Sequence, residues 1–224
     1  MVEGGENVSK TKLATIGVGS ILLLTACGEN ATETIYDHLE NAAQIEKEGF
    51  EVQQEPLVQA EEHEADLYNQ IMELDMEQFE EIVSLADEAI ASIETRRELS
   101  ANEKQSIEEG YEEFSAANEA FAALEEEPLA ELGQTLKEAM EARYESYQKL
   151  HEVYAETLDL DEQLYNLLKT EDLDVETLTN QVEETNAKYE EFQEATDLFN
   201  EHTNTYNDAK QAFYEASDLD VRFE

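Results

Sequence analysis

Apolar residues recur at alternating steps of three and four from Tyr36 to Phe213, and this spacing is the strongest constraint on the fold. It is typical of helices packed like coiled coils, because it gathers the apolar side chains on one face of each helix. The chain has only two prolines, Pro56 and Pro128, and it has no strand-like alternation. The sequence therefore predicts an all-α protein built from long helices.

Breaks in the apolar spacing divide the chain into four helical segments. One break precedes Asp75, which fits the N-cap of a capping box with Gln78 at the third helical position. Another precedes Pro128, which suits a first helical turn, and a third precedes Asp174, which suits an N-cap. Pro56 is expected to kink or divide the first segment.

Helices of about 40 to 50 residues would each be about 60–75 Å long, and short connections favour antiparallel neighbours. We therefore predict an elongated antiparallel up-down bundle of four long, coiled-coil-like helices over residues 35–215. Residues 216–224 would follow it as a C-terminal tail. A helical hairpin pair, or three helices with a mobile first segment, is the alternative architecture.

The first 26 residues predict a lipoprotein signal peptide. Lys10 and Lys12 give it a short basic start, followed by the uncharged apolar run 13–26. This run is shorter than the ~20 apolar residues that a membrane-spanning helix needs. The acidic residues before Val8 do not suit a basic start, so we hypothesise that translation begins at Val8.

The only cysteine of the chain, Cys27, follows this run directly. One cysteine cannot form an internal disulfide and is too few for a thiolate metal site. Leu24, Thr25 and Ala26 precede it and resemble a bacterial lipobox, which implies diacylglyceryl transfer to the Cys27 sulfur, cleavage before Cys27 and often acylation of the new amine. Residues 27–34 would then be a lipidated polar tether on the extracytoplasmic face of the cell membrane. An ordinary secretory peptide with a chance cysteine is the alternative.

The chain is very acidic, with 57 Asp and Glu against 13 Lys and Arg and a formal net charge of −44. Such a charge disfavours nucleic acid and anionic lipid surfaces as direct partners, because the electrostatic contribution would be repulsive. Self-repulsion also lowers folding stability unless salt screens it. The composition therefore suggests a halophilic or alkali-tolerant source and an extracytoplasmic setting.

No residue pattern in the chain predicts catalysis, a metal or a cofactor. A di-metal carboxylate site in a bundle needs Glu three residues before His, and no histidine here has it; the histidines are His38, His63, His151 and His202. The run 159–162, Asp-Leu-Asp-Glu, lacks the glycine of a calcium loop and is predicted to be a solvated helix face. The acidic runs 61–64 and 125–127 could hold divalent cations loosely or simply be exposed charged faces.

Arginine and asparagine provide two candidate binding sets. Arg96, Arg97 and Arg143 could form a recognition patch, but we favour ion pairs with glutamates of neighbouring helices. The asparagines could bind a ligand or set the register between helices; they are Asn200, Asn204 and Asn207.

Four tyrosines provide a third candidate set, because sugar rings stack well on tyrosine. They are Tyr144, Tyr147, Tyr154 and Tyr165. Their helical spacing favours core or boundary positions, with the hydroxyl groups facing water.

Short stretches in a consistent order carry a family resemblance. With the lipobox they are Ile35-Tyr36-Asp37-His38-Leu39, Glu55-Pro56-Leu57, Glu64-Ala65-Asp66-Leu67-Tyr68, Met76-Glu77-Gln78-Phe79, Met140-Glu141-Ala142-Arg143-Tyr144-Glu145-Ser146-Tyr147, Leu164-Tyr165 and Phe199-Asn200-Glu201-His202-Thr203. Their sum resembles the YkyA-type cell-wall-binding lipoproteins of low-GC Gram-positive bacteria. The resemblance implies a lipid-anchored, surface-exposed, all-helical protein that associates with the wall and has no assigned catalysis.

These observations favour a non-enzymatic envelope lipoprotein, a rod that binds cell-wall material or an envelope protein, or acts as a spacer. A high negative charge disfavours anionic wall polymers unless Mg²⁺ or Ca²⁺ bridges the charges, or unless peptidoglycan itself is the target. The alternatives are a substrate-binding lipoprotein of a transport system and a cation-binding acidic surface protein. The transport alternative is weaker, because it needs a concave site and the pattern predicts a narrow, filled bundle.

Overall fold

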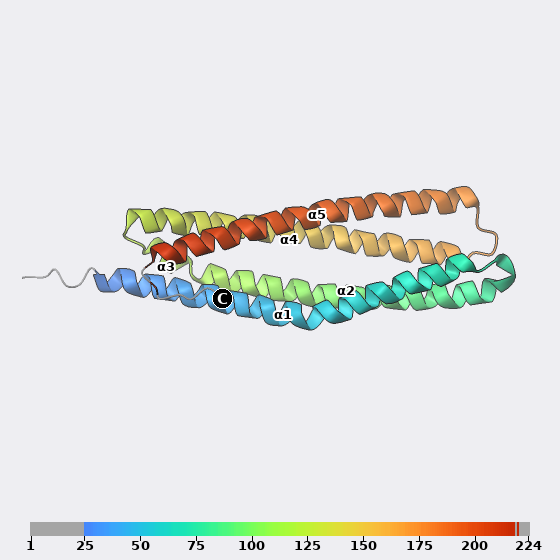
Figure 1. Ribbon diagram of the computed structural model, residues 1–224, viewed down its shortest axis with the longest axis horizontal. Coiled ribbons are helices and arrows are strands. Elements are labelled where there is room, and N and C mark those ends of the chain that lie inside the picture. Colours follow the sequence, from blue (N-terminus) through green and yellow to red (C-terminus); the bar gives the residue numbers. More distant parts are fainter. Residues whose placement is uncertain (1–24, 218, 220–224) are drawn as a thin grey trace, which may run out of the picture.

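The computed structural model describes residues 25–217 and 219, with side chains described from residue 31 onward. The predicted signal peptide therefore lies almost entirely outside the described residues. Four long helices dominate the structure (Figure 1): α1 (Thr25–Glu73), α2 (Phe79–Ala116), α4 (Glu127–Leu168) and α5 (Val175–Ala216). The short 3-10 helix η1 (Met76–Gln78) and the short helix α3 (Asn118–Ala122) lie in the connections. The part of the chain described here holds no strand, and the predicted elongated all-α bundle is confirmed.

The bundle consists of two helical hairpins. Helix α1 packs along α2, and α4 packs along α5, while α2 and α4 join the two hairpins to each other. Over the described range, by contrast, no Cα atoms of α1 and α5 come within 8 Å of each other. Figure 1 shows the hairpins as two layers that share one long axis. The bundle is therefore closed on its α2–α4 side and more widely spaced on its α1–α5 side, where Glu40 and Lys210 bridge the two helices near the start of α1.

Proline and aspartate set three of the helix starts. Asp174 caps α5, its carboxylate accepting a hydrogen bond from the backbone N–H of Thr177 at 3.1 Å, and Pro128 lies in the first turn of α4. Asp75 also caps, but the first turn is a 3-10 helix, which brings the N–H of Glu77 to its carboxylate at 2.8 Å. The side chain of Gln78 donates to Glu81 instead, so the reciprocal half of the predicted capping box is wrong.

Pro56 does not divide the first helix. Helix α1 is continuous through it, and the ribbon changes direction in its middle portion (Figure 1). Pro56 has no N–H to donate to the carbonyl of Val52 four residues earlier. Because Val52 is strongly exposed, water can satisfy that carbonyl, and the helix bends rather than stops.

The described helices extend beyond the expected limits of the bundle. Helix α1 starts at Thr25, so the segment 27–34 is helical, and Ala31 and Thr32 within it are buried. At the other end of the chain Ser217 is buried directly after α5. No helix in the described region is apolar over enough residues to cross a membrane.

Two apolar clusters form the core, one toward each end of the rod. The first joins the start of α1 to α3 and the end of α5 and includes Ile35, Leu39, Leu136 and Phe213. The second lies near η1 and includes Leu67, Ile93 and Leu158. Between these clusters several of the buried side chains are polar, among them Arg96, Ser100, Arg143 and Ser146. The middle of the rod therefore needs internal hydrogen bonds and ion pairs where its ends rely on apolar packing.

Candidate functional site

Three adjoining pockets lie along the more widely spaced side of the bundle, between α1 and α5. The Arg143 pocket has a volume of about 330 Å³, the middle pocket about 130 Å³ and the Arg96 pocket about 510 Å³. The middle pocket shares Glu103 and Tyr147 with the Arg143 pocket, and Glu61 and Phe192 with the Arg96 pocket. We call this row of adjoining pockets the groove, and along it the bundle is not filled as the sequence predicted.

Small and polar side chains keep this groove open. Helix α1 contributes Ala42, Ala43 and Ala65 to it, and α5 contributes Asn200 and other polar residues. The side chain of alanine is too short to fill the space between α1 and α5, whose backbones lie far apart. The apolar spacing of the sequence does not reveal this, because alanine counts as apolar whether or not it fills the space.

The Arg143 pocket is organised by one buried ion pair. The guanidinium of Arg143 donates two hydrogen bonds to the carboxylate of Glu46, at 2.9 and 2.7 Å, and a third to the hydroxyl of Thr203 at 3.3 Å. Its charge also lies over the rings of Phe199 and Tyr206, 5.3 and 5.7 Å from their centres. Arg143 therefore joins α1, α4 and α5 across the groove.

A glycine in α2 makes room for this pair. A methyl group added at Gly110 would lie 2.6 Å from Cγ of Glu46, which is too close for any real contact. The glycine thus allows the Glu46 side chain to pass over α2 on its way to Arg143.

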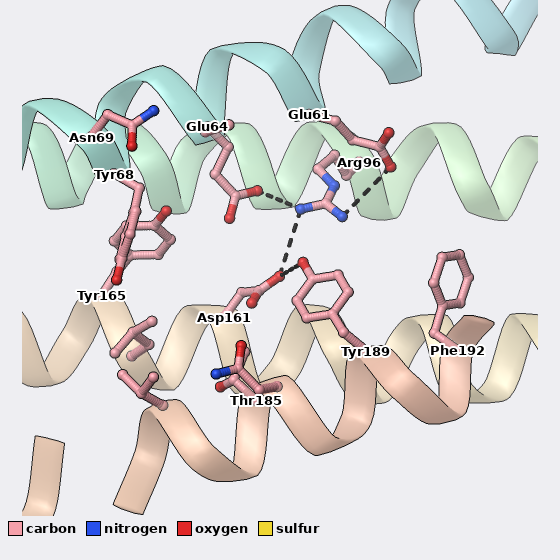
Figure 2. A pocket seen from close by; sticks show the side chains of 14 residues that line it. Glu61, Glu64, Tyr68, Asn69, Arg96, Asp161, Tyr165, Thr185, Tyr189 and Phe192 are labelled. Atoms are coloured by element: carbon pink, nitrogen blue, oxygen red, sulfur yellow. Dashed lines mark hydrogen bonds and ion pairs between the residues drawn. The ribbon is translucent and has the colours of Figure 1, made fainter. Parts of the chain in front are cut away.

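The Arg96 pocket contains a larger polar network (Figure 2). Arg96 is buried. It donates one hydrogen bond to Glu64 through Nη1 and another to the hydroxyl of Tyr154 through Nε, at 3.2 Å. Asp161 and Glu61 lie 3.6 Å from the guanidinium, and the hydroxyl of Tyr189 donates to Asp161 at 2.7 Å.

Burial dominates the protonation of this network. It raises the pKa of Glu64 and of Asp161 above their ordinary values, although Arg96 acts in the opposite direction on both. Burial alone would lower the pKa of Arg96, but Tyr154 and Glu64 outweigh it and raise that pKa. Arg96 is therefore a permanent cation among carboxyl groups that bind protons more readily than usual.

The predicted role of the arginines is confirmed. Arg96 and Arg143 pair as described, and Arg97 pairs with Asp159 at 2.7 Å and Glu162 at 3.0 Å. The prediction of a solvated face over residues 159–162 is wrong in part, because Leu160 and Asp161 are buried. These two side chains turn inward between the exposed acids that hold Arg97.

Three of the four candidate tyrosines are core residues, as predicted. Tyr147, Tyr154 and Tyr165 are buried, but their hydroxyl groups bond to carboxylates rather than to water, which corrects that part of the prediction. Tyr144 stacks on Tyr111 of α2, with ring centres 3.9 Å apart, and lines none of the pockets that form the groove. The four therefore do not form one platform.

Other aromatic side chains line the groove where a ligand can reach them. The residues missed by sequence reasoning are Phe50, Tyr68, Tyr189, Phe192 and Phe199. Phe50 is 43% exposed and Tyr189 37%, which is unusual for large aromatic side chains. In the sequence only Glu46 and Gln53 indicated this, because they interrupt the apolar spacing on either side of Phe50.

The remaining candidates divide between the groove and the surface. Asn200 and Asn207 line the Arg143 pocket, whereas Asn204 is exposed outside it. Glu125 and Glu126 lie exposed in the connection before α4, and Glu127 is the exposed first residue of that helix. Among the residues whose positions are described, no three His, Cys, Asp or Glu side chains are grouped so that they could hold a metal ion. The side chains of the lipobox, Cys27 included, lie outside the described ones.

Comparison with known proteins places the chain in a family. Residues 30–216 match the model of the family YkyA, described as "Putative cell-wall binding lipoprotein". The chain belongs to this lipoprotein family. It is 32% identical over 202 residues to "Uncharacterized lipoprotein YkyA" of Bacillus subtilis (strain 168), and the alignment covers 90% of each chain.

A solved structure shares the fold. It is a conserved protein of unknown function from Staphylococcus aureus, with a TM-score of 0.62 and 11% sequence identity. The match covers 89% of this chain and all of the other. At this identity the likeness concerns the arrangement of helices alone.

Proposed function

We propose that this protein is a non-catalytic, lipid-anchored envelope protein that binds the glycan of the cell wall along the groove between α1 and α5. The observation that carries the proposal is the groove itself, a row of three adjoining pockets between α1 and α5 that is lined with aromatic and amide side chains. Family membership supports the lipoprotein part of the proposal and agrees with wall binding.

The dimensions of the groove suit an extended polymer. Along α1 it runs from Ala42 to Asn69, which corresponds to about 40 Å at 1.5 Å per residue. A polymer of sugar rings could lie against several aromatic faces at once, with Asn200 and Asn207 available to bond its hydroxyl and amide groups. An open groove also lets a long chain enter from the side, without threading.

Charge favours a neutral glycan over an anionic polymer. The protein carries a formal charge of −44, and the two buried arginines of the groove are already held by carboxylates. Neither Arg96 nor Arg143 therefore offers free positive charge to a phosphate or carboxylate polymer. The sugar backbone of peptidoglycan carries little charge, so its binding would cost little electrostatic repulsion.

Anchoring through Cys27 belongs to the same proposal. Two acyl chains on one residue hold a protein to a bilayer far better than a single chain does. Growth with a fatty-acid analogue should label the wild-type protein, and Cys27→Ser should abolish the label and release the protein from the membrane fraction. Persistent labelling of Cys27→Ser would contradict the assignment.

Co-sedimentation tests wall binding directly. The mature chain carrying Cys27→Ser should pellet with purified peptidoglycan that has been stripped of anionic polymers, with or without Mg²⁺. The double variant Phe50→Ala/Phe199→Ala should pellet at least tenfold less, because it removes two aromatic faces from the Arg143 pocket. Tyr144→Ala is the matched control, since it removes an aromatic ring outside the groove.

Each other outcome of that experiment has a definite meaning. Pelleting only with Mg²⁺ would indicate cation bridging by the acidic surface rather than recognition in the groove. Failure to pellet under every condition would exclude wall binding and favour an envelope-protein partner or a spacer.

A second candidate function is substrate binding for a transport system. The Arg96 pocket, at about 510 Å³, has the volume of a small-molecule site, and this observation favours it. A small solute that binds the native state raises the melting temperature, and once its concentration exceeds Kd the rise grows with the logarithm of that concentration. A solute that does so at micromolar concentration, with no pelleting on peptidoglycan, would favour transport over wall binding.

A further inference from the structure

The Arg96 pocket holds more negative than positive charge. Glu61, Glu64 and Asp161 surround the single guanidinium of Arg96, so three carboxylates face one cation. Two of these carboxylates, Glu64 and Asp161, are buried. Tyr154, Tyr165 and Tyr189 each give one hydroxyl hydrogen bond to these carboxylates, but they add no positive charge. One arginine therefore leaves the negative charge of the pocket unbalanced.

A buried hydroxyl group in the same pocket lacks a partner. Thr185 of α5 lines the pocket, is only 6% exposed, and its hydroxyl oxygen has no hydrogen-bond partner within the described structure. Other threonines of α5, such as Thr179 and Thr196, donate to the carbonyl four residues earlier. Figure 2 shows Thr185 on α5, on the side of the pocket where Asp161 lies.

Such a group is rare and costs stability. Most buried polar groups in folded proteins have a hydrogen-bond partner, and an exception indicates strain or an absent water, ion or ligand. Thr185 therefore points to a ligand independently of the carboxylates.

Aromatic rings complete the walls of the pocket. Tyr68, Tyr165, Tyr189 and Phe192 line it, and ring faces attract cations. Carboxylates and aromatic faces together favour an organic cation that has both a charge and an apolar stem. A bare divalent cation fits less well, because it requires six or more oxygen ligands and gains nothing from the rings.

We propose that the Arg96 pocket binds a primary alkylammonium group, with Asp161, Glu64 and the hydroxyl of Thr185 accepting its three N–H bonds. The apolar stem of the ligand then lies against aromatic rings that line the pocket, such as that of Tyr68. Each carboxylate has two oxygens that can accept several hydrogen bonds, so both carboxylates can hold Arg96 and the ammonium group together.

This proposal rests on the proposed function in one respect, because it names the group that one end of the groove recognises in the wall. An amine-bearing peptide branching from the glycan would place its charged end in the Arg96 pocket while the sugars occupy the rest of the groove.

Titration with n-butylammonium chloride tests the inference without any wall material. Binding to the mature chain carrying Cys27→Ser should be saturable by NMR or calorimetry, and sodium chloride at equal ionic strength should not reproduce it. Thr185→Val, which replaces the hydroxyl by a methyl group of similar shape, should weaken binding at least threefold. Asp161→Asn should weaken it at least tenfold, while Thr205→Val, an exposed threonine of the same helix, should bind as the wild type does.

The outcomes separate this inference from the proposed function. No saturable binding of butylammonium, or equal affinity in Thr185→Val and wild type, would overturn the ammonium site even if peptidoglycan still pellets the protein. Saturable binding that depends on Thr185, with no pelleting on peptidoglycan, would support the ammonium site and overturn wall binding. If Asp161→Asn does not fold, Thr185→Val alone decides.

Discussion

Arg96 and Arg143 are buried in the middle of the rod, and each is held by a carboxylate from α1. Apolar residues could replace either arginine at little cost only if its carboxylate partner were replaced in the same variant. Removing one partner leaves a charge in a site that water reaches poorly, and this is the costly step. The Arg143 pair therefore ties α1 to α4, and Arg96 ties α1 and α2 to Asp161 of α4.

Arg96→Met should lower the free energy of unfolding by about 3–5 kcal/mol at neutral pH, because it leaves Glu64 and Asp161 unpaired. Arg97→Met should cost about 1 kcal/mol or less, since Arg97 pairs near the surface and water screens its partners. Urea unfolding followed by circular dichroism measures both values. Equal losses for the two variants would show that the Arg96 network is not effectively buried.

The pairing of the arginines could be predicted from the sequence, whereas the burial of Asp161 could not. A chain with so few arginines among 57 acids gives each arginine several possible partners. Asp161, however, belongs to a run of polar residues that resembles an exposed face. Its burial depends on Arg96 and Tyr189, which come from two other helices and are distant in the sequence.

The two helices of each hairpin pack closely, whereas α1 and α5, which belong to different hairpins, are farther apart. A methyl group at Gly49 would overlap the side chain of Ser106, so α1 and α2 are as close there as a glycine permits. Helix lengths, starts and antiparallel order follow from the apolar spacing and from Asp174 and Pro128. The opening between α1 and α5 does not follow from these, because it depends on how two complete hairpins pack and not on either one alone.

Gly49→Ala should destabilise the protein by about 1–3 kcal/mol, because the added methyl group must push α1 and α2 apart. Ser106→Gly removes the atoms that it would overlap, so the double variant Gly49→Ala/Ser106→Gly should recover part of that loss. A double-mutant cycle from denaturant unfolding gives the coupling energy. A coupling near zero would mean that the two helices do not approach each other at this point.

Pro56→Ala should stabilise the protein, since proline inside a helix costs about 3 kcal/mol relative to alanine and Pro56 is exposed. The gain is expected to be about 1–3 kcal/mol in urea unfolding, with part of it offset by a straighter α1 that packs less well. The same variant should bind peptidoglycan more weakly if the bend shapes the groove. A loss of stability would mean that the bend is required by the packing of α1.

The net charge of the whole molecule determines how its stability responds to salt. With a formal charge of −44, most surface carboxylates have no cation to pair with, and long-range repulsion acts along the entire rod. The ion pairs of the interior are screened much less by salt than the surface repulsion is. Salt therefore changes the repulsion more than it changes the pairs that hold the bundle together.

Raising the salt concentration from about 0.1 M to about 1 M shortens the screening length from ~10 Å to ~3 Å. The melting temperature should rise by about 5 °C or more over this range, because the repulsion is relieved in the folded rod more than in the expanded unfolded chain. Differential scanning calorimetry in NaCl and in KCl measures it. An unchanged melting temperature would argue against a halophilic adaptation.

Acidification should also stabilise the protein. Burial raises the pKa of Glu64, Glu103 and Asp161, so these groups take up protons in the native state before they do in the unfolded chain. Their contribution to stability is fully present below the unfolded pKa and is lost as pH rises through the raised native pKa. The melting temperature should therefore be higher at about pH 5 than at pH 7.

One carboxyl group acts in the opposite direction. Burial alone would raise the pKa of Glu40, but Lys210 and Tyr214 outweigh it and lower that pKa. The stability that Glu40 contributes is present above its unfolded pKa and is lost as pH falls through the lowered native value. Stability should consequently decline again in stronger acid. Glu40→Gln should weaken this decline, and a melting temperature that falls steadily from pH 7 downward would contradict the assignment.

The direction of α1 also sets the distance between the lipid anchor and the Arg96 pocket. Helix α1 starts at Thr25, and Glu64 lies about 55 Å along it from Cys27 at 1.5 Å per residue. Near the start of α1, Glu40 bonds to Lys210 and Tyr214 of α5 and bridges the two helices there, whereas the Arg96 pocket lies toward the opposite end. A lipid on Cys27 would therefore hold the ammonium site well above the bilayer. The length of one helix would decide which layer of the envelope this protein can reach.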